Sequence, residues 1–472
     1  MTTTDPRPTT ISTAAPRLRE RIPAVSHLRA FIRDPLALFD GMHASHGDVV
    51  EFFMAGDRWV LLSHPEDIER VHLETTRGYR KGYQEYKKIG YVFRHTLGNG
   101  LVTSEGSFWR TQRRLAQPAF HGRRIRGYAD VMVSYTQQMI DKWQPGQDFD
   151  MRILMGGLTQ RIAAMSFFGT DTEAESSRAS KALDKIMLGF NAELASMVLE
   201  RLPAFVRTPN RRRVDSAIAD FDDVVAEFVR NRRAAPEGTH SDLLAMLVEA
   251  RDDDGTQMTD QQLRDELVTM YVAAQETTTS TLAWIWYFLG RRPDLARRVY
   301  DEVDEVFGGQ SPTPEKLPQL KLLRAVVDEV LRLYPPAWRV FRVPEEDVEF
   351  RGFRVKAGTM VAMSQWVTHR DPRWFDKPTE FDPDRWLDGR TAKLPKYAYW
   401  PFGGGPRVCI GTGFALMEIV LVAATIAQRL RYTLLDTEVT PYPMITLRPD
   451  PGVRVRAESI ADAPTPAADP VD

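Results

Sequence analysis

The chain is poor in cysteine and has no excess of charge of either sign. Cys409 is the one cysteine among 472 residues, which excludes an internal disulfide and the paired thiolates of a zinc or iron–sulfur site. With 62 basic and 64 acidic residues the net charge is −2, so nothing indicates nucleic acid as a partner. A lone thiol suits the reducing cytoplasm, where we expect the protein.

Long apolar runs are also missing. The longest, residues 282–289, is far shorter than the roughly 20 apolar residues that span a membrane. Residues 1–22 lack the apolar core of a signal peptide, and residues 458–472 are rich in Ala, Asp and Pro. We therefore expect disordered ends, no membrane anchor, and one folded domain over residues 23–457, because no flexible linker interrupts the middle of the chain.

The apolar pattern predicts a mostly helical protein with small β-sheets. Helical periodicity dominates residues 106–333, and a further helix is predicted to begin at Pro65. Strand patterns occupy residues 48–53, 58–62, 348–353, 359–363 and 445–455. The first two strands are expected to form a hairpin. The fold class is therefore α+β, with the helices in the middle of the chain and the sheets towards its ends.

Cys409 lies in a glycine-rich segment, Phe-Gly-Gly-Gly-Pro-Arg-Val-Cys-Ile-Gly, at residues 402–411. An apolar run follows, which predicts a loop that leads into a helix over about residues 410–430. Free backbone N–H groups and the helix dipole stabilise a thiolate at such a place. A single activated thiolate suits either a catalytic nucleophile or an axial haem ligand. No histidine stands in a recognised cysteine-protease context.

The spacing of Phe402, Gly405, Arg407, Cys409 and Gly411 matches F-x-x-G-x-R-x-C-x-G. It resembles the haem-ligand signature of the cytochrome P450 family. The resemblance implies a cytochrome P450 fold with a single haem-binding domain and haem b as cofactor. Cys409 would then ligate the iron, Phe402 would pack beside the sulfur, Arg407 would pair with a haem propionate, and the glycines would let the backbone approach the porphyrin.

A long helix is predicted from the capping box of Thr259 and Gln262 to about residue 289. Midway it carries Ala-Ala-Gln-Glu-Thr-Thr at residues 273–278, which resembles the oxygen-activation motif of the family. A carboxylate beside a hydroxyl can relay protons to bound dioxygen, and the resemblance assigns that task to Glu276 and Thr277. The alternative is a threonine-rich stretch whose hydroxyls bond back to i−4 carbonyls and bend the helix.

Two further motifs match the family in order along the chain. Glu329 and Arg332 form an E-x-x-R pair on one helical face, and Arg385 precedes a tryptophan as in the P-x-R-[FW] element. In the family these three residues form a buried structural network. Trp109 and Arg113 match W-x-x-x-R, and with Arg342 they would bond the haem propionates; the alternative for each arginine is a solvated surface position. These are all inferences from the resemblance.

The resemblance implies a monooxygenase that inserts one atom of O2 into a lipophilic small molecule. Electrons are expected from separate proteins, a ferredoxin and its NAD(P)H-dependent reductase. A basic face for docking is predicted at Arg110, Arg113, Arg114, Arg123, Arg124 and Arg126. Two other functions stay open: a peroxide-driven or rearranging haem–thiolate enzyme, and a haem-binding ligand sensor without turnover.

Three segments look most like soluble actinobacterial members that oxidise terpenes or other lipophilic metabolites of secondary metabolism. They are residues 143–146, 395–398 and 445–449. By family analogy the substrate is a terpenoid or a fatty-acyl chain, in a mainly apolar pocket. The residues expected to line it are Ala273, Ala337, Met444, Ile445 and the loop of residues 83–97.

Overall fold

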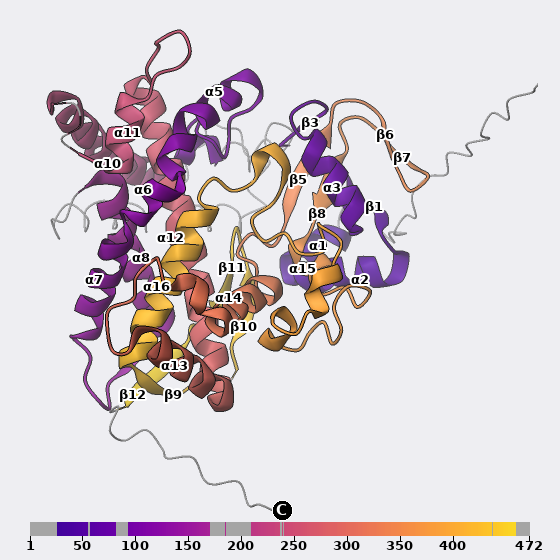
Figure 1. The fold of residues 1–472 in the computed structure, drawn as a ribbon. Helices are drawn as coiled ribbons and strands as arrows, with labels where there is room; N and C mark the ends of the chain where they lie inside the picture. The colour runs from indigo at the N-terminus through magenta and orange to yellow at the C-terminus, as the bar shows by residue number, and fades with distance from the viewer. Residues whose placement is uncertain are drawn as a thin grey trace, which may run out of the picture. The chain divides into compact units, whose positions relative to one another are not determined.

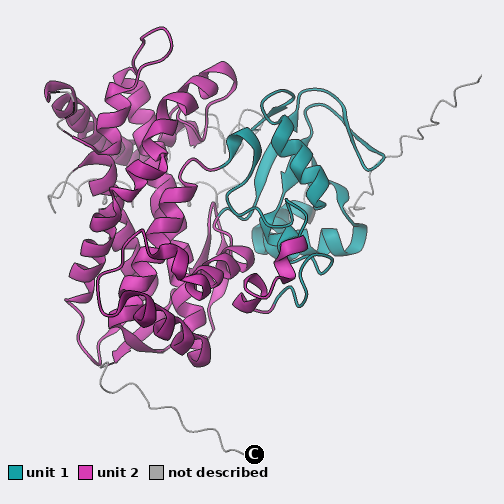
Figure 2. Ribbon diagram, in the orientation of Figure 1, with its two compact units in different colours: residues 1–86, 337–379, 394–408 teal, residues 87–336, 380–393, 409–472 magenta. Residues whose placement is uncertain are grey.

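The structure is a computed structural model that describes residues 26–54, 57–81, 93–169, 185, 209–236, 238, 240–436 and 438–458. Of the predicted disordered ends, residues 1–22 and 459–472 lie outside this part of the chain, whereas Glu458, predicted to begin the disordered tail, belongs to a strand that ends there. The chain folds into two compact units (Figure 2). Unit 1 comprises residues 1–86, 337–379 and 394–408, and unit 2 comprises residues 87–336, 380–393 and 409–472.

Unit 1 is built on a five-stranded sheet with the strand order β1–β2–β8–β5–β3 (Figure 1). The strands are β1 (Val49–Met54), β2 (Asp57–Leu62), β3 (Tyr79–Arg80), β5 (Val340–Pro344) and β8 (Met360–Met363). β2 and β8 run parallel, whereas the other neighbours are antiparallel. The predicted hairpin of β1 and β2 is thereby confirmed.

The helices of unit 1 are short. They are α1 (Ser26–Arg33), α2 (Pro35–His46), α3 (Pro65–Glu74), α15 (Gln365–Thr368) and η6 (Gly405–Arg407). The predicted start of a helix at Pro65 is confirmed: proline occupies the first helical position, where its missing N–H costs nothing, and His64 Nδ1 accepts from the Glu66 amide.

The prediction of one strand over residues 348–353 is wrong. The structure has a second hairpin there, β6 (Val348–Phe350) and β7 (Phe353–Val355). Its two central residues both have positive φ, 51° at Arg351 and 83° at Gly352, as the tight hairpin turns require. The conformational freedom of Gly352 places the turn within the segment predicted as one strand.

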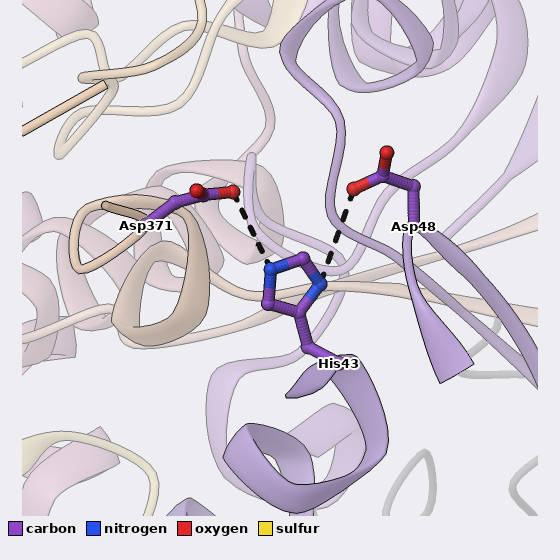
Figure 3. Close-up of side chains that lie close together, drawn as sticks. All are labelled: His43, Asp48 and Asp371. Carbon is purple, nitrogen blue, oxygen red and sulfur yellow. Dashed lines mark ion pairs between the residues drawn. The ribbon is translucent and has the colours of Figure 1, made fainter. Parts of the chain in front are cut away.

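Long-range charge pairs fasten the loops of unit 1. In Figure 3, His43 of α2 lies between Asp48 and Asp371, with Nε2 3.4 Å from Asp371 Oδ2 and Nδ1 3.9 Å from Asp48 Oδ1. Arg373 also binds both carboxylates, at 2.9 Å to Asp48 Oδ2 and 3.0 Å to Asp371 Oδ1. Hydrogen bonding to Asp371 raises the pKa of His43. The Arg373 guanidinium offsets one of the two negative charges and a protonated His43 offsets the other, so the cluster ties α2 to two loops of unit 1.

Unit 2 is mainly helical (Figure 1). Its longer helices are α5 (Gly106–Ala116), α7 (Ala129–Ile140), α8 (Met151–Phe168), α10 (Pro209–Ala234), α12 (Asp260–Arg291), α13 (Pro293–Phe307), α14 (Lys321–Leu333) and α16 (Thr412–Arg429). Shorter helices are η1 (Gln117–Phe120), α6 (Gly122–Arg126), α11 (Leu243–Glu249), η3 (Leu317–Gln319), η4 (Pro383–Trp386) and η5 (Arg390–Lys393). The helical prediction for residues 106–333 is confirmed where the chain is described.

Two small sheets complete the described part of unit 2. One has the order β4–β12–β9 and the other pairs β10 with β11. The strands are β4 (Asp148–Asp150), β9 (Arg431–Leu434), β10 (Thr440–Pro443), β11 (Leu447–Asp450) and β12 (Arg454–Glu458). The predicted fold class, mostly helical with small sheets, is therefore confirmed.

The 32 residues of α12 form the central helix of unit 2. Its capping box is formed as predicted: Thr259 Oγ1 accepts from the Gln262 amide, and the Gln262 side chain accepts from the Thr259 amide at 2.7 Å. α8, α10, α14 and α16 pack against it. Among the described helices, only α16 is long and apolar enough to cross a membrane, but 67% of that window is buried inside the protein, as expected of a core helix.

Candidate functional site

The residues of the candidate site fall in both units, and the chain passes from unit 1 to unit 2 between Val408 and Cys409. Phe402, Arg407, Arg342 and Ala337 belong to unit 1. Trp109, Arg113, Ala273, Glu276, Thr277, Cys409, Gly411, Met444 and Ile445 belong to unit 2. Each group has its own geometry.

In unit 1, the glycine-rich loop before the cysteine lies directly against α3. Gly405 has a φ of +61°, and a Cβ there would lie 2.1 Å from the His72 carbonyl oxygen. A Cβ on Gly404 would lie 2.3 Å from the Tyr397 ring, and the Gly405 amide donates to Tyr397 Oη at 3.1 Å. Gly405 thus approaches the backbone of α3 and Gly404 approaches the Tyr397 ring too closely for any side chain, so the loop geometry depends on both glycines.

His72 packs against the same loop as a neutral side chain. It is 1% exposed, and its ring stacks on Tyr397 with 5.3 Å between centroids. Burial, together with the nearby Arg342 cation, lowers the pKa of His72 to about 3. The sequence motifs gave no signal for this residue, because its role comes from packing.

The two arginines of unit 1 that are predicted to bind the haem propionates occupy different surroundings. Arg342 lies in β5 and is 8% exposed; its Nε donates to Thr75 Oγ1 and its Nη1 to the Phe341 carbonyl, both at 2.7 Å. Arg407 ends η6 and is half-buried, as is Phe402. Arg342 is thus not a solvated surface residue. Contact of either arginine with a propionate stays a prediction.

In unit 2, Cys409 precedes α16 by three residues. The helix begins at Thr412, slightly later than predicted, and the Thr412 hydroxyl donates to the Cys409 carbonyl at 2.9 Å. Burial raises the pKa of the Cys409 thiol, and the Gly411 N–H and the Arg113 cation offset only part of that rise. The Gly411 N–H and the Thr412 hydroxyl at the helix start thus lower the pKa of this thiol, as expected there, but burial outweighs them. A bound metal ion deprotonates its thiol ligand outright.

The surroundings of Cys409 fit a haem group. Cys409 has exposed surface, so its thiol is accessible to a ligand. α5 brings Arg113 close enough to interact with it, and burial lowers the pKa of that arginine. Trp109, one turn earlier in α5, is 5% exposed. Within unit 2, one thiol and a neighbouring arginine cation that can pair with a propionate are donors suited to haem b.

The middle of α12 is accessible although its flanks are buried. Tyr271 and Thr278 are buried, whereas Ala273 is exposed and both Glu276 and Thr277 are half-buried. The Thr277 hydroxyl donates to the Ala273 carbonyl at 2.8 Å. Thr279 and Thr281 bond back in the same way, so the bonds expected from the structural alternative are formed. The catalytic role of Glu276 and Thr277 stays a prediction.

Glu276 has a long-range partner that the motif did not indicate. Its Oε1 accepts a hydrogen bond of 3.0 Å from Thr446 Oγ1. Thr446 directly follows Met444 and Ile445, which are half-buried. Of the predicted substrate loop, residues 83–92 lie outside the described residues. Ala337 is exposed in unit 1.

The predicted structural network is formed around Glu329. Glu329 and Arg332 are 0% exposed, and Arg385 is 2% exposed. Glu329 Oε1 accepts from Arg332 Nη2 at 2.8 Å and from Arg385 Nε at 3.0 Å. Two donors were not predicted, the Trp386 indole N–H and the Asp382 amide, both at 2.9 Å. The buried carboxylate is thus fully compensated.

A second buried carboxyl group went unnoticed in the sequence. Glu418 of α16 is 1% exposed, and burial raises its pKa to about 8, against a smaller opposing effect of hydrogen bonding with Thr278. The group is therefore largely protonated at neutral pH. A lone glutamate in an apolar helical run was the available signal, but it does not distinguish a buried position from a solvated one.

We expect Glu418→Gln to change the pH dependence of stability. Between about pH 4.5 and 8 the folded protein holds a proton that the unfolded chain has released, so the free energy of unfolding falls as pH rises. Glutamine does not titrate, so this loss of stability is absent from the variant. The free energy of unfolding of the variant, relative to that of wild type, should therefore rise by several kcal/mol from pH 5 to pH 9, because one pKa unit corresponds to about 1.4 kcal/mol. Denaturant unfolding at pH 5, 7 and 9 measures the effect. Glu305→Gln, on an exposed position of α13, is the control, and equal pH profiles for both variants would contradict the prediction.

Comparison with known proteins is consistent with this site. The family model described as Cytochrome P450 matches residues 16–455. A cyclooctat-9-en-7-ol 5-monooxygenase of Streptomyces melanosporofaciens is 39% identical, over 87% of this chain and 88% of that relative. A pentalenene oxygenase of Streptomyces avermitilis is 32% identical, over 92% of this chain and 95% of that relative.

Solved structures align with the fold of this chain. The retinoic-acid-bound cyanobacterial CYP120A1 aligns with a TM-score of 0.82 and 25% identity, over 95% of this chain and 99% of that chain. The haem domain of cytochrome P450DA aligns with a TM-score of 0.84 and 25% identity, over 95% of this chain and 98% of that chain.

Proposed function

Because the chain belongs to the cytochrome P450 family, it is a haem b monooxygenase, and we propose that its substrate is a terpenoid. The observation that carries the proposal is the similarity to relatives whose names give terpenoid substrates, across 87% and 92% of this chain. The accessible Ala273 on α12 and the half-buried Met444 and Ile445 support it, because apolar side chains suit a ligand oriented by shape.

We assign the parts of the reaction to the residues as follows. Cys409 would hold the iron, and Trp109, Arg113, Arg342 and Arg407 the propionates. When bound, haem supplies the activation of O2, aided by electron donation from the thiolate. Glu276 accepts protons at its carboxylate. The Thr277 hydroxyl donates a hydrogen bond to the Ala273 carbonyl; to act in the relay it would turn from that carbonyl, release its own proton towards the accessible middle of α12 and take up the next proton at its oxygen.

Members of the family receive electrons from redox partners, and here we propose a ferredoxin and its NAD(P)H-dependent reductase in the cytoplasm. Arg110, Arg123, Arg124 and Arg126 are exposed, and His121, Gly122, Arg123 and Arg126 line an open depression. An acidic ferredoxin would complement this charge. Arg114 contributes less than expected, because it pairs with Asp252 and Asp253.

A spectral titration tests the substrate class. The ferric haem should change spin state with pentalenene or cyclooctat-9-en-7-ol, and less with dodecanoic acid or 4-hydroxybenzoic acid. A response confined to the fatty acid or the aromatic acid would contradict the proposal. Product formation that needs NAD(P)H and redox partners would exclude the ligand sensor, and product formation driven by peroxide alone would favour the peroxygenase.

We expect Thr277→Ala to retain haem and ligand binding but to divert electrons to hydrogen peroxide. Proton delivery by a positioned group typically contributes about a hundredfold to ten-thousandfold, so product per NAD(P)H should fall clearly. Thr277→Ser, which keeps the hydroxyl, is the matched control. Unchanged product per NAD(P)H in Thr277→Ala would remove this hydroxyl from the mechanism.

A further inference from the structure

The loop between β10 and β11 carries the donor that holds Glu276. The two strands pair antiparallel with Pro443 opposite Leu447, which leaves Met444, Ile445 and Thr446 as a three-residue loop. The Met444 amide donates to the Thr446 carbonyl at 3.1 Å and closes the loop on itself. The short loop leaves Thr446 little freedom of its own.

Both ends of this arrangement are anchored in unit 2. The Leu447 amide donates to the Pro336 carbonyl at 2.9 Å, just after the end of α14, and the Leu447 side chain is 0% exposed. β11 also packs against α12. The Thr446 hydroxyl therefore approaches Glu276 from a loop whose backbone is held in place by hydrogen bonds.

The hydrogen bond connects two parts of the site that the sequence keeps 170 residues apart. Its acceptor is the carboxylate of the proton-relay pair, and its donor adjoins Met444 and Ile445, two side chains we assign to the substrate. A half-buried glutamate has several rotamers, and a single fixed donor selects among them. Without this hydrogen bond the carboxylate is no longer held in one position.

We propose that Thr446 is a positioning residue that holds the Glu276 carboxylate for proton delivery, so that the substrate-facing loop sets the efficiency of the relay. The proposal rests on the monooxygenase mechanism and on the roles of Glu276 and Thr277 given above. It adds a residue outside both family motifs and a direct link between the substrate loop and the proton path.

The test uses the haem-loaded protein with a plant-type ferredoxin and its reductase, without ligand and with cyclooctat-9-en-7-ol. Thr446→Val keeps the side-chain shape but removes the donor. It should raise hydrogen peroxide released per NADPH roughly two- to tenfold, the effect of one lost hydrogen bond. Thr446→Ser should restore the wild-type ratio. Thr440→Val is the matched control, because Thr440 lies in the same hairpin and its exposed hydroxyl points to the Asp450 carbonyl.

A double-mutant cycle separates positioning from a general structural effect. In the Glu276→Gln background, where the relay is already broken, Thr446→Val should cause no further rise in peroxide. The spectral dissociation constant for cyclooctat-9-en-7-ol should stay within about twofold, since one neighbouring hydroxyl is changed and no apolar contact. Equal peroxide ratios for Thr446→Val and Thr440→Val, or an undiminished effect in the Glu276→Gln background, would overturn the proposal.

Hydrogen exchange gives a readout that does not depend on turnover. Amides of residues 444–447 should exchange at the wild-type rate in Thr446→Val, because backbone hydrogen bonds and not the Thr446 hydroxyl hold this loop. Faster exchange of these amides in Thr446→Val would show that the variant loosens the loop itself and would overturn the proposal. Failure of the proposed function has a different signature: terpenoids would give no spin-state change in wild type, while peroxide release and hydrogen exchange stay measurable without them.

Discussion

Replacing Cys409 by histidine is expected to abolish the red-shifted Soret band that reduced, carbon-monoxide-bound haem shows with a thiolate ligand. The effect should be complete, because Cys409 is the only cysteine of the chain and no second thiol can take its place. Imidazole donates less electron density to the iron than a thiolate does, so oxygen activation should fall with the band. Absorption spectra of the reduced protein with and without carbon monoxide measure the outcome.

Thr412→Val is the matched control for this experiment. It removes the hydroxyl that bonds the Cys409 carbonyl but leaves the sulfur in place, so the band should remain. If Cys409→His keeps the band, the sulfur of Cys409 is not the axial ligand and the assignment of the site is wrong.

Replacing Glu329 by alanine is expected to destabilise the protein by about 3–5 kcal/mol, the usual cost of removing one partner from a buried ion pair. The variant would leave Arg332 and Arg385 as buried cations and would deprive the Trp386 indole N–H of its acceptor. Native domains are stable by only about 5–15 kcal/mol, so much of the variant should be unfolded or aggregated at expression. Denaturant midpoints, or soluble yield where none is measurable, report the effect.

Arg324→Ala serves as the control on the same helix. Arg324 pairs with Asp328 at 2.9 Å, but its side chain is 47% exposed, and exposed ion pairs contribute about 0–1 kcal/mol. A Glu329 variant no less stable than Arg324→Ala would show that the buried network is not needed for the fold.

Features that depend on neighbouring residues along the chain were determined by the sequence itself. The capping box of Thr259 and Gln262 and the pairing of Glu329 with Arg332 follow from spacing within one helical turn. The hairpin of β1 and β2 follows from two strand patterns around a glycine. The cysteine loop is recognisable in the sequence because a close approach of the backbone requires glycine and a metal ligand requires cysteine, each at a fixed position. Local geometry of this kind is set by covalent connectivity.

Only the tertiary structure decided the features that depend on long-range packing. Thr446 meets Glu276 across 170 residues, and Trp386 meets Glu329 across 57; no periodicity encodes such meetings. The protonated state of Glu418 and the raised pKa of Cys409 arise from burial, which is set by every element that packs around these groups. The chain alone thus specifies its motifs and their chemistry, whereas the partners, the burial and the charge states of the same side chains come from the packing of distant segments.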